Sequence, residues 1–332
     1  MQLFVGSVIC VLLSLSFPGI VSKLENNITQ CGDFFFQGKA PVFPDILNDS
    51  ITQNDSYEII CQTYKNKSRF ATLYNTTNKI PVFSAYKYTG TYQTTNRLGQ
   101  MGQLWMTESQ LEPSGAEMSE PFVKQARNQD YWIKKNVYTC TPGALFPISH
   151  AADNETAEST LTLTNSVPLK DDFREGLWSL VENTTKEDMD INCRDNNNNI
   201  VAYVLTGAIA GNNKMNNRVN IPTLVWTAFC CFNKETLYSR GFWAENKPEK
   251  KTEIKLKSLK VVQEYLKKKF GKPVELFSNN CSVNASQLKP ILNESQCHNK
   301  CHPLLQYVTE FIHYILNDII LQGISNMLVS TE

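Results

Sequence analysis

Alternating apolar and polar residues indicate that the first half of this chain is rich in β-strands. The segments that alternate are 57–64, 69–74 and 80–88. Because neighbouring side chains on a strand point to opposite faces, a period of two predicts strands that bury one face. Residues 75–79 are polar and predict the hairpin turn between the last two of these strands.

The second half predicts strands of a more buried kind. Residues 200–207 form an almost continuous apolar run, which fits a strand covered on both faces. Residues 211–217 predict a turn, and residues 218–231 resume an extended pattern. The asparagine run 196–199 predicts a solvated turn rather than a cluster of ligands.

Two segments instead repeat apolar residues at the spacing of a helix. The first begins at Asp171 or Asp172, either of which is expected as the N-cap, and runs to about Asn183. Its predicted buried stripe consists of Phe173, Leu177, Trp178 and Val181. The second helix spans 258–270 and is expected to bury Leu259, Val262, Leu266 and Phe270. Its lysines predict a solvated basic face, with attraction of phosphate as the alternative.

A third helical repeat lies near the C-terminal end of the chain, in residues 303–321. Glu310 and Asp318 interrupt its apolar face, so the repeat does not predict a membrane span. We expect a helix that packs on the domain or binds a partner.

Length and charge limit the possible classes. The 332 residues suffice for one large core, and 32 basic residues balance 32 acidic ones. A dedicated nucleic-acid binder usually carries excess basic charge. The neutral total therefore argues against tight nucleic-acid binding, although a local basic patch is compatible with it.

The N-terminus has the pattern of an export signal. Residues 3–15 are apolar, Pro18 and Gly19 end the run, and cleavage is expected after Ser22. We therefore expect a secreted, extracellular protein. The predicted organisation has three parts: a signal peptide at 1–22, a domain at 23–250, and a helical extension packed on that domain at 251–332.

Sequons for asparagine-linked glycosylation support secretion independently. Each consists of Asn-x-Ser/Thr without an intervening proline, and such sites are used only in exported chains. The predicted glycosylation sites are Asn27, Asn48, Asn54, Asn66, Asn75, Asn154, Asn183, Asn280, Asn284 and Asn293.

Cysteine usage fits an oxidising compartment. Cys10 leaves with the signal peptide, and nine cysteines remain. They predict disulfides, and their odd number leaves one thiol free or paired between chains. The pairing stays open at this point. The segment C-H-N-K-C-H from Cys297 also predicts a disulfide, with a zinc site that uses His313 as the alternative.

Three motifs between residues 141 and 182 contain the candidate chemistry. They read T-P-G-A-L-F-P from Thr141, T-L-T-N-S-V-P from Thr162, and D-F-R-E-G-L-W from Asp172, ending at Glu182. In order and spacing they resemble the D-R-G-H-L, T-N-x-x-P-Q and N-x-G-x-W-x-x-x-E motifs of the DNA/RNA non-specific endonucleases. The residues that keep this frame are Gly143, Leu145, Asn165, Pro168, Gly176, Trp178 and Glu182.

The resemblance covers roughly residues 30–275 and is closest to the vertebrate endonuclease domain-containing 1 group of that family. It rests also on R-F-A-T-L-Y-N-T-T-N-K-I-P-V-F-S-A-Y from Arg69 and on I-P-T-L-V-W-T-A-F-C-C from Ile221. It implies an α+β fold, with a mainly antiparallel sheet, a ββα-metal (His-Me finger) core and C-terminal helices. It also implies magnesium as the family's cofactor and nucleic acid as a candidate partner.

The residues at the family's catalytic positions have changed. The histidine that serves as general base falls on Ala144, and the asparagine that ligates the metal falls on Arg174. A methyl group cannot accept a proton, and a guanidinium has only donors and repels a cation. Asn165 and Glu182 keep catalytic positions but cannot substitute for the lost groups. We therefore expect no bound magnesium.

Two neighbouring positions differ as well, because Pro142 replaces an arginine and Leu169 replaces a glutamine of the family pattern. We expect Arg174 to occupy the former metal position, the alternative being a solvated surface charge. It should share one helix face with Glu182 without a direct ion pair, because two turns separate them. His150 is expected to be structural rather than a replacement base.

The sequence supports three functions and leaves open whether the protein is an enzyme. We favour a secreted glycoprotein on a nuclease scaffold that binds nucleic acid or another partner without cleavage. The alternative is an active magnesium-dependent endonuclease that hydrolyses DNA or RNA with an unidentified base. A third hypothesis is a purely structural or partner-binding role through the C-terminal helices, which would be supported by a neutral groove or by one that glycans at the flanking sequons Asn154 and Asn183 cover.

Overall fold

The structure is a computed structural model that describes residues 23–91, 105–112, 122–131 and 140–281. These residues belong to the first of two units, 1–283 and 284–332. The predicted signal peptide, the C-H-N-K-C-H segment and the predicted helix at 303–321 lie outside the described residues. None of the helices within the described ranges is long and apolar enough to cross a membrane.

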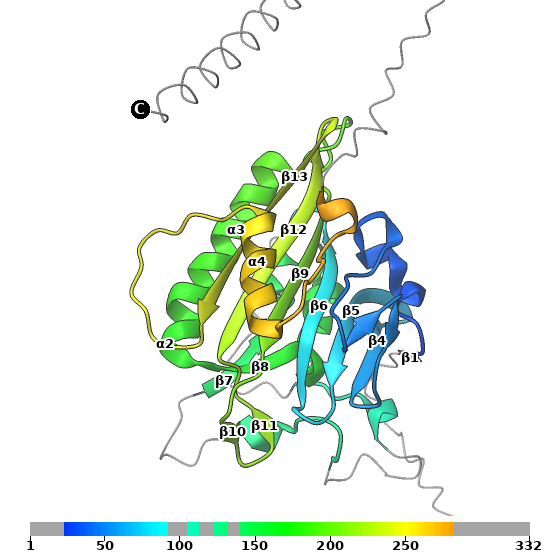
Figure 1. Cartoon of the computed structure of the whole chain (residues 1–332), viewed down its shortest axis with the longest axis vertical. Coiled ribbons are helices and arrows are strands. Elements are labelled where there is room, and N and C mark those ends of the chain that lie inside the picture. Colours follow the sequence, from blue (N-terminus) through cyan, green and yellow to red (C-terminus); the bar gives the residue numbers. More distant parts are fainter. Residues whose placement is uncertain (1–22, 92–104, 113–121, 132–139, 282–332) are drawn as a thin grey trace, which may run out of the picture. The chain divides into compact units, whose positions relative to one another are not determined.

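A seven-stranded antiparallel sheet forms the centre of the fold (Figure 1). Its order is β1-β4-β5-β6-β9-β12-β13, and every neighbouring pair is antiparallel. The strands are β1 Lys23–Glu25, β4 Tyr57–Tyr64, β5 Lys67–Asn75, β6 Ile80–Tyr88, β9 Ala202–Ile209, β12 Leu224–Asn233 and β13 Thr236–Glu245. The predicted α+β class with a mainly antiparallel sheet is therefore confirmed.

Within the described residues, three two-stranded ribbons accompany the sheet, and short helical turns occur between the strands. The ribbons are β2 Leu47–Asn48 with β3 Ile51–Thr52, β7 Cys140–Ala144 with β8 Ser166–Lys170, and β10 Lys214–Met215 with β11 Val219–Asn220. The helical turns are η1 Ile28–Phe34, η2 Phe36–Gly38, η3 Ser109–Leu111, η4 Asn128–Tyr131, η5 Ile148–His150, η6 Leu163–Asn165 and η8 Ser278–Cys281, together with α1 Asn154–Ser159.

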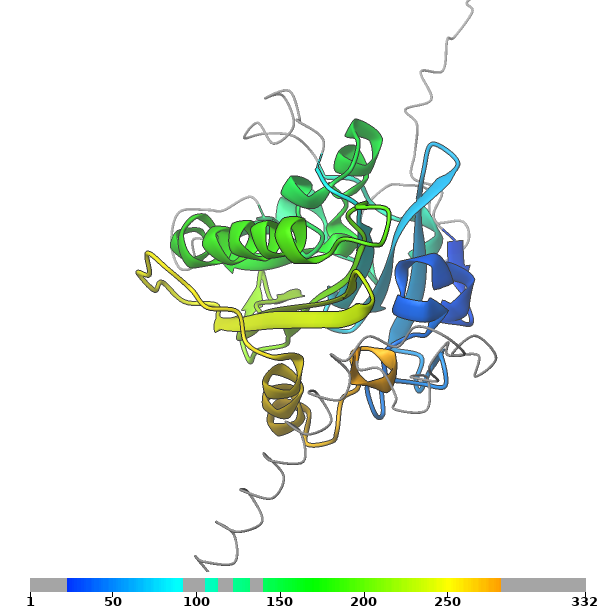
Figure 2. The same cartoon turned by 90° about the horizontal axis from the view of Figure 1, so that it is seen from above.

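The sheet separates two layers, because successive side chains of a central strand enter different cores. In β12, Leu224, Trp226, Ala228 and Cys230 join one core, whereas Val225, Phe229 and Cys231 join the cores of the opposite face. The first core contains α4 (Leu259–Phe270) and η1; the other face is covered by α3 (Ser179–Asn192). Figure 2 shows α3 and α4 on opposite sides of the sheet.

The helix that follows β8 differs from its prediction at both ends and in its middle. It begins at Asp171, with Lys170 rather than an aspartate as N-cap, and the helical run ends at Asn192 rather than near Asn183. It consists of α2 (Asp171–Phe173), a π-helical turn η7 (Arg174–Trp178) and α3. The predicted stripe is nevertheless buried, including Phe173 and Trp178. The error at the end of the helix arises because Met189 is buried well beyond the predicted stop.

The helix at 258–270 is confirmed as α4, with Leu259, Val262 and Leu266 buried against β12 and β13. Phe270, also expected to be buried, is only half-buried because it lies in the last turn of the helix. Strand β13 was missed by the sequence analysis. Its residues Ser239, Arg240 and Gly241 break the apolar alternation. Gly241 is required there, since a Cβ would overlap the carbonyl oxygen of Thr227 on the neighbouring strand.

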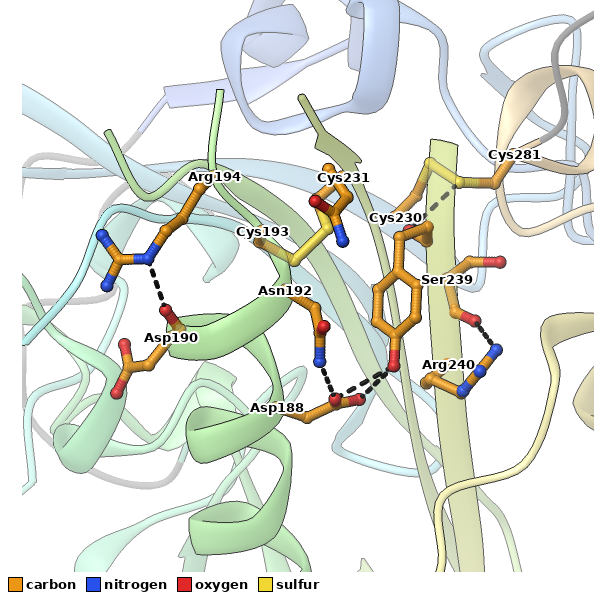
Figure 3. The surroundings of a disulfide bond; sticks show 12 residues. Asp188, Asp190, Asn192, Cys193, Arg194, Cys230, Cys231, Ser239, Arg240 and Cys281 are labelled. Carbon is orange, nitrogen blue, oxygen red and sulfur yellow. Dashed lines mark hydrogen bonds between the residues drawn. A yellow bond between two sulfur atoms is a disulfide. The ribbon is translucent and has the colours of Figure 1, made fainter. Parts of the chain in front are cut away.

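Two adjacent cysteines of β12 form disulfides with the layers on opposite faces of the sheet. Cys230 pairs with Cys281, which follows α4, and Cys231 pairs with Cys193 at the end of α3 (Figure 3). A third disulfide joins Cys31 to Cys61, and among the described cysteines only Cys140 is free. The prediction of disulfides is confirmed. The pairing follows from strand alternation, which directs the two neighbouring sulfur atoms to opposite faces.

Candidate functional site

The family's first two motifs form the hairpin of β7 and β8. Ala144 lies opposite Ser166 and Pro142 lies opposite Pro168 in this ribbon. Ala144 is half-buried, and its methyl group can neither accept a proton nor bind a metal. The position to which the sequence resemblance assigns the family's general base therefore carries no group that can act as a base.

Leu169 fills the space beside Gly143 on the neighbouring strand. A Cβ at Gly143 would overlap two atoms of the Leu169 side chain, which is itself buried. The hairpin therefore accepts a large apolar residue at position 169 only because a glycine faces it. The family's glutamine is replaced by a group that packs and donates no hydrogen bond.

Arg174 connects the helix to the hairpin. Its Nε donates a hydrogen bond of 2.9 Å to Oγ1 of Thr141, whose hydroxyl donates at 2.7 Å to the carboxylate of Asp171. Its Nη2 also lies 2.8 Å from Oε1 of Glu175. The side chain is 36% exposed, so part of the guanidinium can still reach a ligand.

The π-helical turn changes which residues lie above one another. Its wider i→i+5 spacing inserts an extra residue, so the four-residue periodicity from Arg174 to Glu182 is broken. Arg174 makes its hydrogen bonds to Thr141 and Glu175, and none joins it to Glu182. Arg174 and Glu182 therefore form no direct ion pair, as expected. The reason includes the π-helical turn and the other hydrogen bonds of Arg174, and not only the axial distance between the two residues.

Asn165 is fully buried and uses its whole amide. Its Oδ1 accepts hydrogen bonds from Oγ of Ser84 at 2.8 Å and from the backbone N–H of Phe146 at 3.0 Å. Its Nδ2 donates to the carbonyl oxygens of Phe146 at 3.1 Å and Thr160 at 2.9 Å. This side chain holds the end of the hairpin against β6 (Ile80–Tyr88).

His150 is hydrogen-bonded to the backbone of helix α3 at Glu182. The Nε2 of His150 donates to the backbone carbonyl oxygen of Glu182 at 3.0 Å, so Nδ1 is the acceptor for the hydroxyl of Tyr86 at 2.8 Å. Burial lowers the pKa of His150 to about 4. The histidine is therefore neutral, with both nitrogens occupied, which agrees with the structural role expected for it.

The carboxyl group of Glu182 is largely removed from water. It lines a small cavity together with apolar residues such as Leu145 and Trp178 and with polar ones, which are Tyr86, His150, Thr185, Thr206 and Thr227. Desolvation raises its pKa to about 8, against smaller opposing effects of the Trp178 indole and the charge of Arg174. Near neutral pH the protonated form of this carboxyl therefore predominates.

We expect the free energy of unfolding to fall as the pH rises from 6.5 to 8, because of Glu182. Its pKa rises from 4.5 in the unfolded chain to about 8 in the folded one. Between these values only the folded chain keeps the proton, so stability decreases by up to ~1.4 kcal/mol per pH unit. Below 6.5 this decrease is opposed, because His150 then gains a proton in the unfolded chain while the folded chain excludes it down to about pH 4.

Urea unfolding at several pH values checks this expectation. Glu182→Gln should remove the decline between pH 6.5 and 8, because an amide does not titrate. Glu187→Gln alters an exposed glutamate on the same helix and should preserve the decline. An equal slope in both variants would contradict the assignment to Glu182.

The residues at the former metal position do not fit a magnesium ion. Magnesium requires oxygen ligands, and the position offers the guanidinium of Arg174 instead. The amide oxygen of Asn165 already accepts two hydrogen bonds, from Ser84 and from the backbone of Phe146. Within the described ranges no three His, Cys, Asp or Glu side chains are grouped to hold a metal.

Sequence reasoning missed the partners supplied by β6. Ser84 holds Asn165 and Tyr86 holds His150, although both residues lie within the segment from Arg69 that showed the resemblance. The available signal was their spacing of two, which places polar groups on the buried face of a predicted strand. A polar group in such a position needs a buried partner.

Comparison with known proteins identifies the family to which the chain is similar. Residues 48–279 match the sequence profile of the DNA/RNA non-specific endonuclease family. The human endonuclease domain-containing 1 protein is 27% identical over 289 residues, which covers 82% of this chain and 52% of the relative. The mouse protein of that name is 30% identical over 227 residues, covering 64% of this chain and 41% of the relative. The chain thus spans about half the length of these curated relatives.

A solved structure was also found. A chain from the crystal structure of the EndoG/EndoGI complex, which concerns the mechanism of EndoG inhibition, aligns with a TM-score of 0.46 and 15% identity. The alignment covers 67% of this chain and 87% of that chain.

Proposed function

Because this chain belongs to the DNA/RNA non-specific endonuclease family, we propose that it is a secreted glycoprotein that binds nucleic acid without cleaving it. The observation that supports this proposal is Arg174, a partly exposed cation fixed by Thr141 at the position of the family's metal ligand. Such a group can contact a phosphate directly where other members would place a metal between protein and phosphate.

The loss of cleavage follows from the chemistry of the same residues. Hydrolysis of a phosphodiester needs a base for the attacking water and a positive centre that can bind the leaving oxygen. Ala144 provides no base, and the nearest histidine, His150, has both nitrogens engaged. We therefore place magnesium-dependent endonuclease activity second, as the alternative function.

Secretion and glycosylation belong to the same proposal. The three disulfides are of a kind that persists in oxidising compartments. Sequon side chains at Asn48, Asn54, Asn66, Asn154 and Asn183 are exposed, as a glycan requires. Asn75 differs, because it is only 8% exposed and its Oδ1 accepts a hydrogen bond from the backbone N–H of Asn78.

Binding of labelled DNA to the full secreted chain in EDTA tests the proposal. We expect binding without metal, and we expect Arg174→Gln to weaken it about tenfold, the scale of one charge-assisted hydrogen bond. Arg240→Gln removes the same charge from β13 and should change affinity little. No binding in EDTA, or equal losses in both variants, would contradict the role of Arg174.

A further inference from the structure

Positive charge is concentrated in one segment of this neutral chain. Between residues 247 and 272 there are ten lysines and three glutamates, a net charge of +7. Because the whole chain is neutral, the remainder has a net charge of −7. The segment comprises the loop after β13, which passes along the edge of the sheet, and helix α4 (Figures 1 and 2).

Most of these lysines are free to bind an external anion. The buried face of α4 consists of Leu259, Val262 and Leu266, so its lysines point away from the sheet. In the loop, Lys247 and Lys251 are neutralised by neighbouring glutamates. The lysines for which no ion pair is found within the described residues, here called the basic surface, are Lys250, Lys255, Lys257, Lys260, Lys267, Lys268 and Lys269.

Two aromatic rings organise one side of the basic surface. Trp243 of β13 and Tyr265 of α4 stack with ring centroids 4.2 Å apart and an interplanar angle of 16°. The ammonium group of Lys257 lies 5.3 Å from the Trp243 ring centroid, and that of Lys269 lies 5.5 Å from the Tyr265 ring centroid. These cation–π contacts restrict the two lysines without neutralising their charge.

The same contacts decide what kind of ligand fits. Proteins that bind single-stranded nucleic acid stack bases on exposed aromatic faces. Here each ring is stacked on the other, and a lysine is associated with each. The surface therefore offers positive charge without an open platform for bases, which suits a ligand whose phosphates are outside and whose bases are already paired.

We propose that the basic surface is a second nucleic-acid contact, which binds the phosphate backbone of a duplex independently of base sequence. This inference rests on the proposed nucleic-acid binding and names a further part of the molecule that provides it. It also explains how a chain of zero net charge can bind a polyanion, because the charges are separated along the fold.

The test compares two sets of substitutions with equal change in charge. The first is Lys260→Gln, Lys267→Gln and Lys268→Gln, three exposed lysines of α4 that take part in no ring contact. The matched control is Lys39→Gln, Lys214→Gln and Lys234→Gln, which are exposed elsewhere. Affinity of the full secreted chain for a 20-base-pair duplex and for the corresponding single strand is measured in EDTA over a range of salt concentrations.

We expect the α4 variant to bind the duplex at least tenfold more weakly at low salt, with an unchanged thermal unfolding temperature. The slope of log affinity against log salt should decrease in magnitude by about 0.9 for each phosphate that the variant no longer neutralises. The natural chain should prefer the duplex to the single strand. The control variant should keep both the slope and the preference.

The inference would be overturned by equal losses in the control variant, by tighter binding of the single strand, or by binding of heparin with no binding of the duplex. Arg174→Gln separates this inference from the proposed function. If that substitution weakens DNA binding and the α4 variant does not, the proposed function stands and the second contact is wrong. If the natural chain binds no nucleic acid at all, both are wrong.

Discussion

The natural chain is expected to leave plasmid DNA and RNA intact in magnesium or manganese, whereas a variant with Ala144→His and Arg174→Asn should cut both. The first substitution restores a base and the second restores an oxygen ligand at the family's metal position. Each missing group costs several powers of ten in rate. We therefore expect a gain of at least about a thousandfold over the natural chain, measured as loss of supercoiled plasmid.

The structure identifies what else the variant has to accommodate. Removal of Arg174 takes away its hydrogen bond to Oγ1 of Thr141, whose hydroxyl still donates to the carboxylate of Asp171. Pro142→Arg and Leu169→Gln are added if the double variant is silent, and glutamine can occupy the space that Leu169 takes beside Gly143. A matched control carries Ala144→Gln with Arg174→Asn, which supplies a polar side chain at position 144 but no base.

Each outcome has a definite meaning. Cutting by the natural chain that disappears in Glu182→Ala would contradict the proposed loss of activity and would require a different base. A silent natural chain beside an active variant would show that only the chemical groups were lost. If all variants are silent, the family relationship extends to the fold only, and the search for a function turns to binding partners.

Asn165→Ala should destabilise the folded chain by about 4 kcal/mol, from the hydrogen bonds it removes and the buried groups it leaves unpaired. The substitution breaks four hydrogen bonds at once. The backbone N–H and carbonyl of Phe146 are then left without this partner inside the protein. We expect a clear decrease in the urea midpoint of unfolding with little change in its slope.

The comparison with an exposed asparagine makes this result specific. Asn196→Ala alters a side chain in the solvated turn after α3 and should change the midpoint by little. If Asn165→Ala unfolds like the natural chain, the amide is not a structural clamp, and its position in the family motif has to be explained by a ligand instead.

The sequence contained enough local information to predict the long strands β4, β5 and β6 and helix α4. Strands β4, β5 and β6 and helix α4 follow from residue alternation or from helical spacing, because each periodicity is a property of neighbouring residues. The proposed absence of a base at Ala144 also comes from the sequence, since no conformation gives a methyl group the ability to accept a proton.

Several features of the candidate site depend on residues far apart in the chain. Asn165 meets Ser84, 81 residues away, and His150 meets Tyr86, 64 residues away. The four-residue spacing of Arg174, Trp178 and Glu182 predicted a regular α-helix and did not indicate the π-helical turn at 174–178. These arrangements could not be predicted because they depend on which surfaces the sheet brings together.

The sequence by itself determined the presence of disulfides, because cysteines are read directly from the chain, and it indicated the fold class through the family resemblance, with which the strand periodicity agrees. Only the tertiary structure decided that Cys230 and Cys231 form disulfides with different layers, because such pairing requires that both faces of β12 are covered. It also decided that Asn165 is a buried clamp and that the carboxyl of Glu182 favours its neutral form. Hydrogen-bond partners and desolvation are set by the packed surroundings of a group, which no local pattern contains.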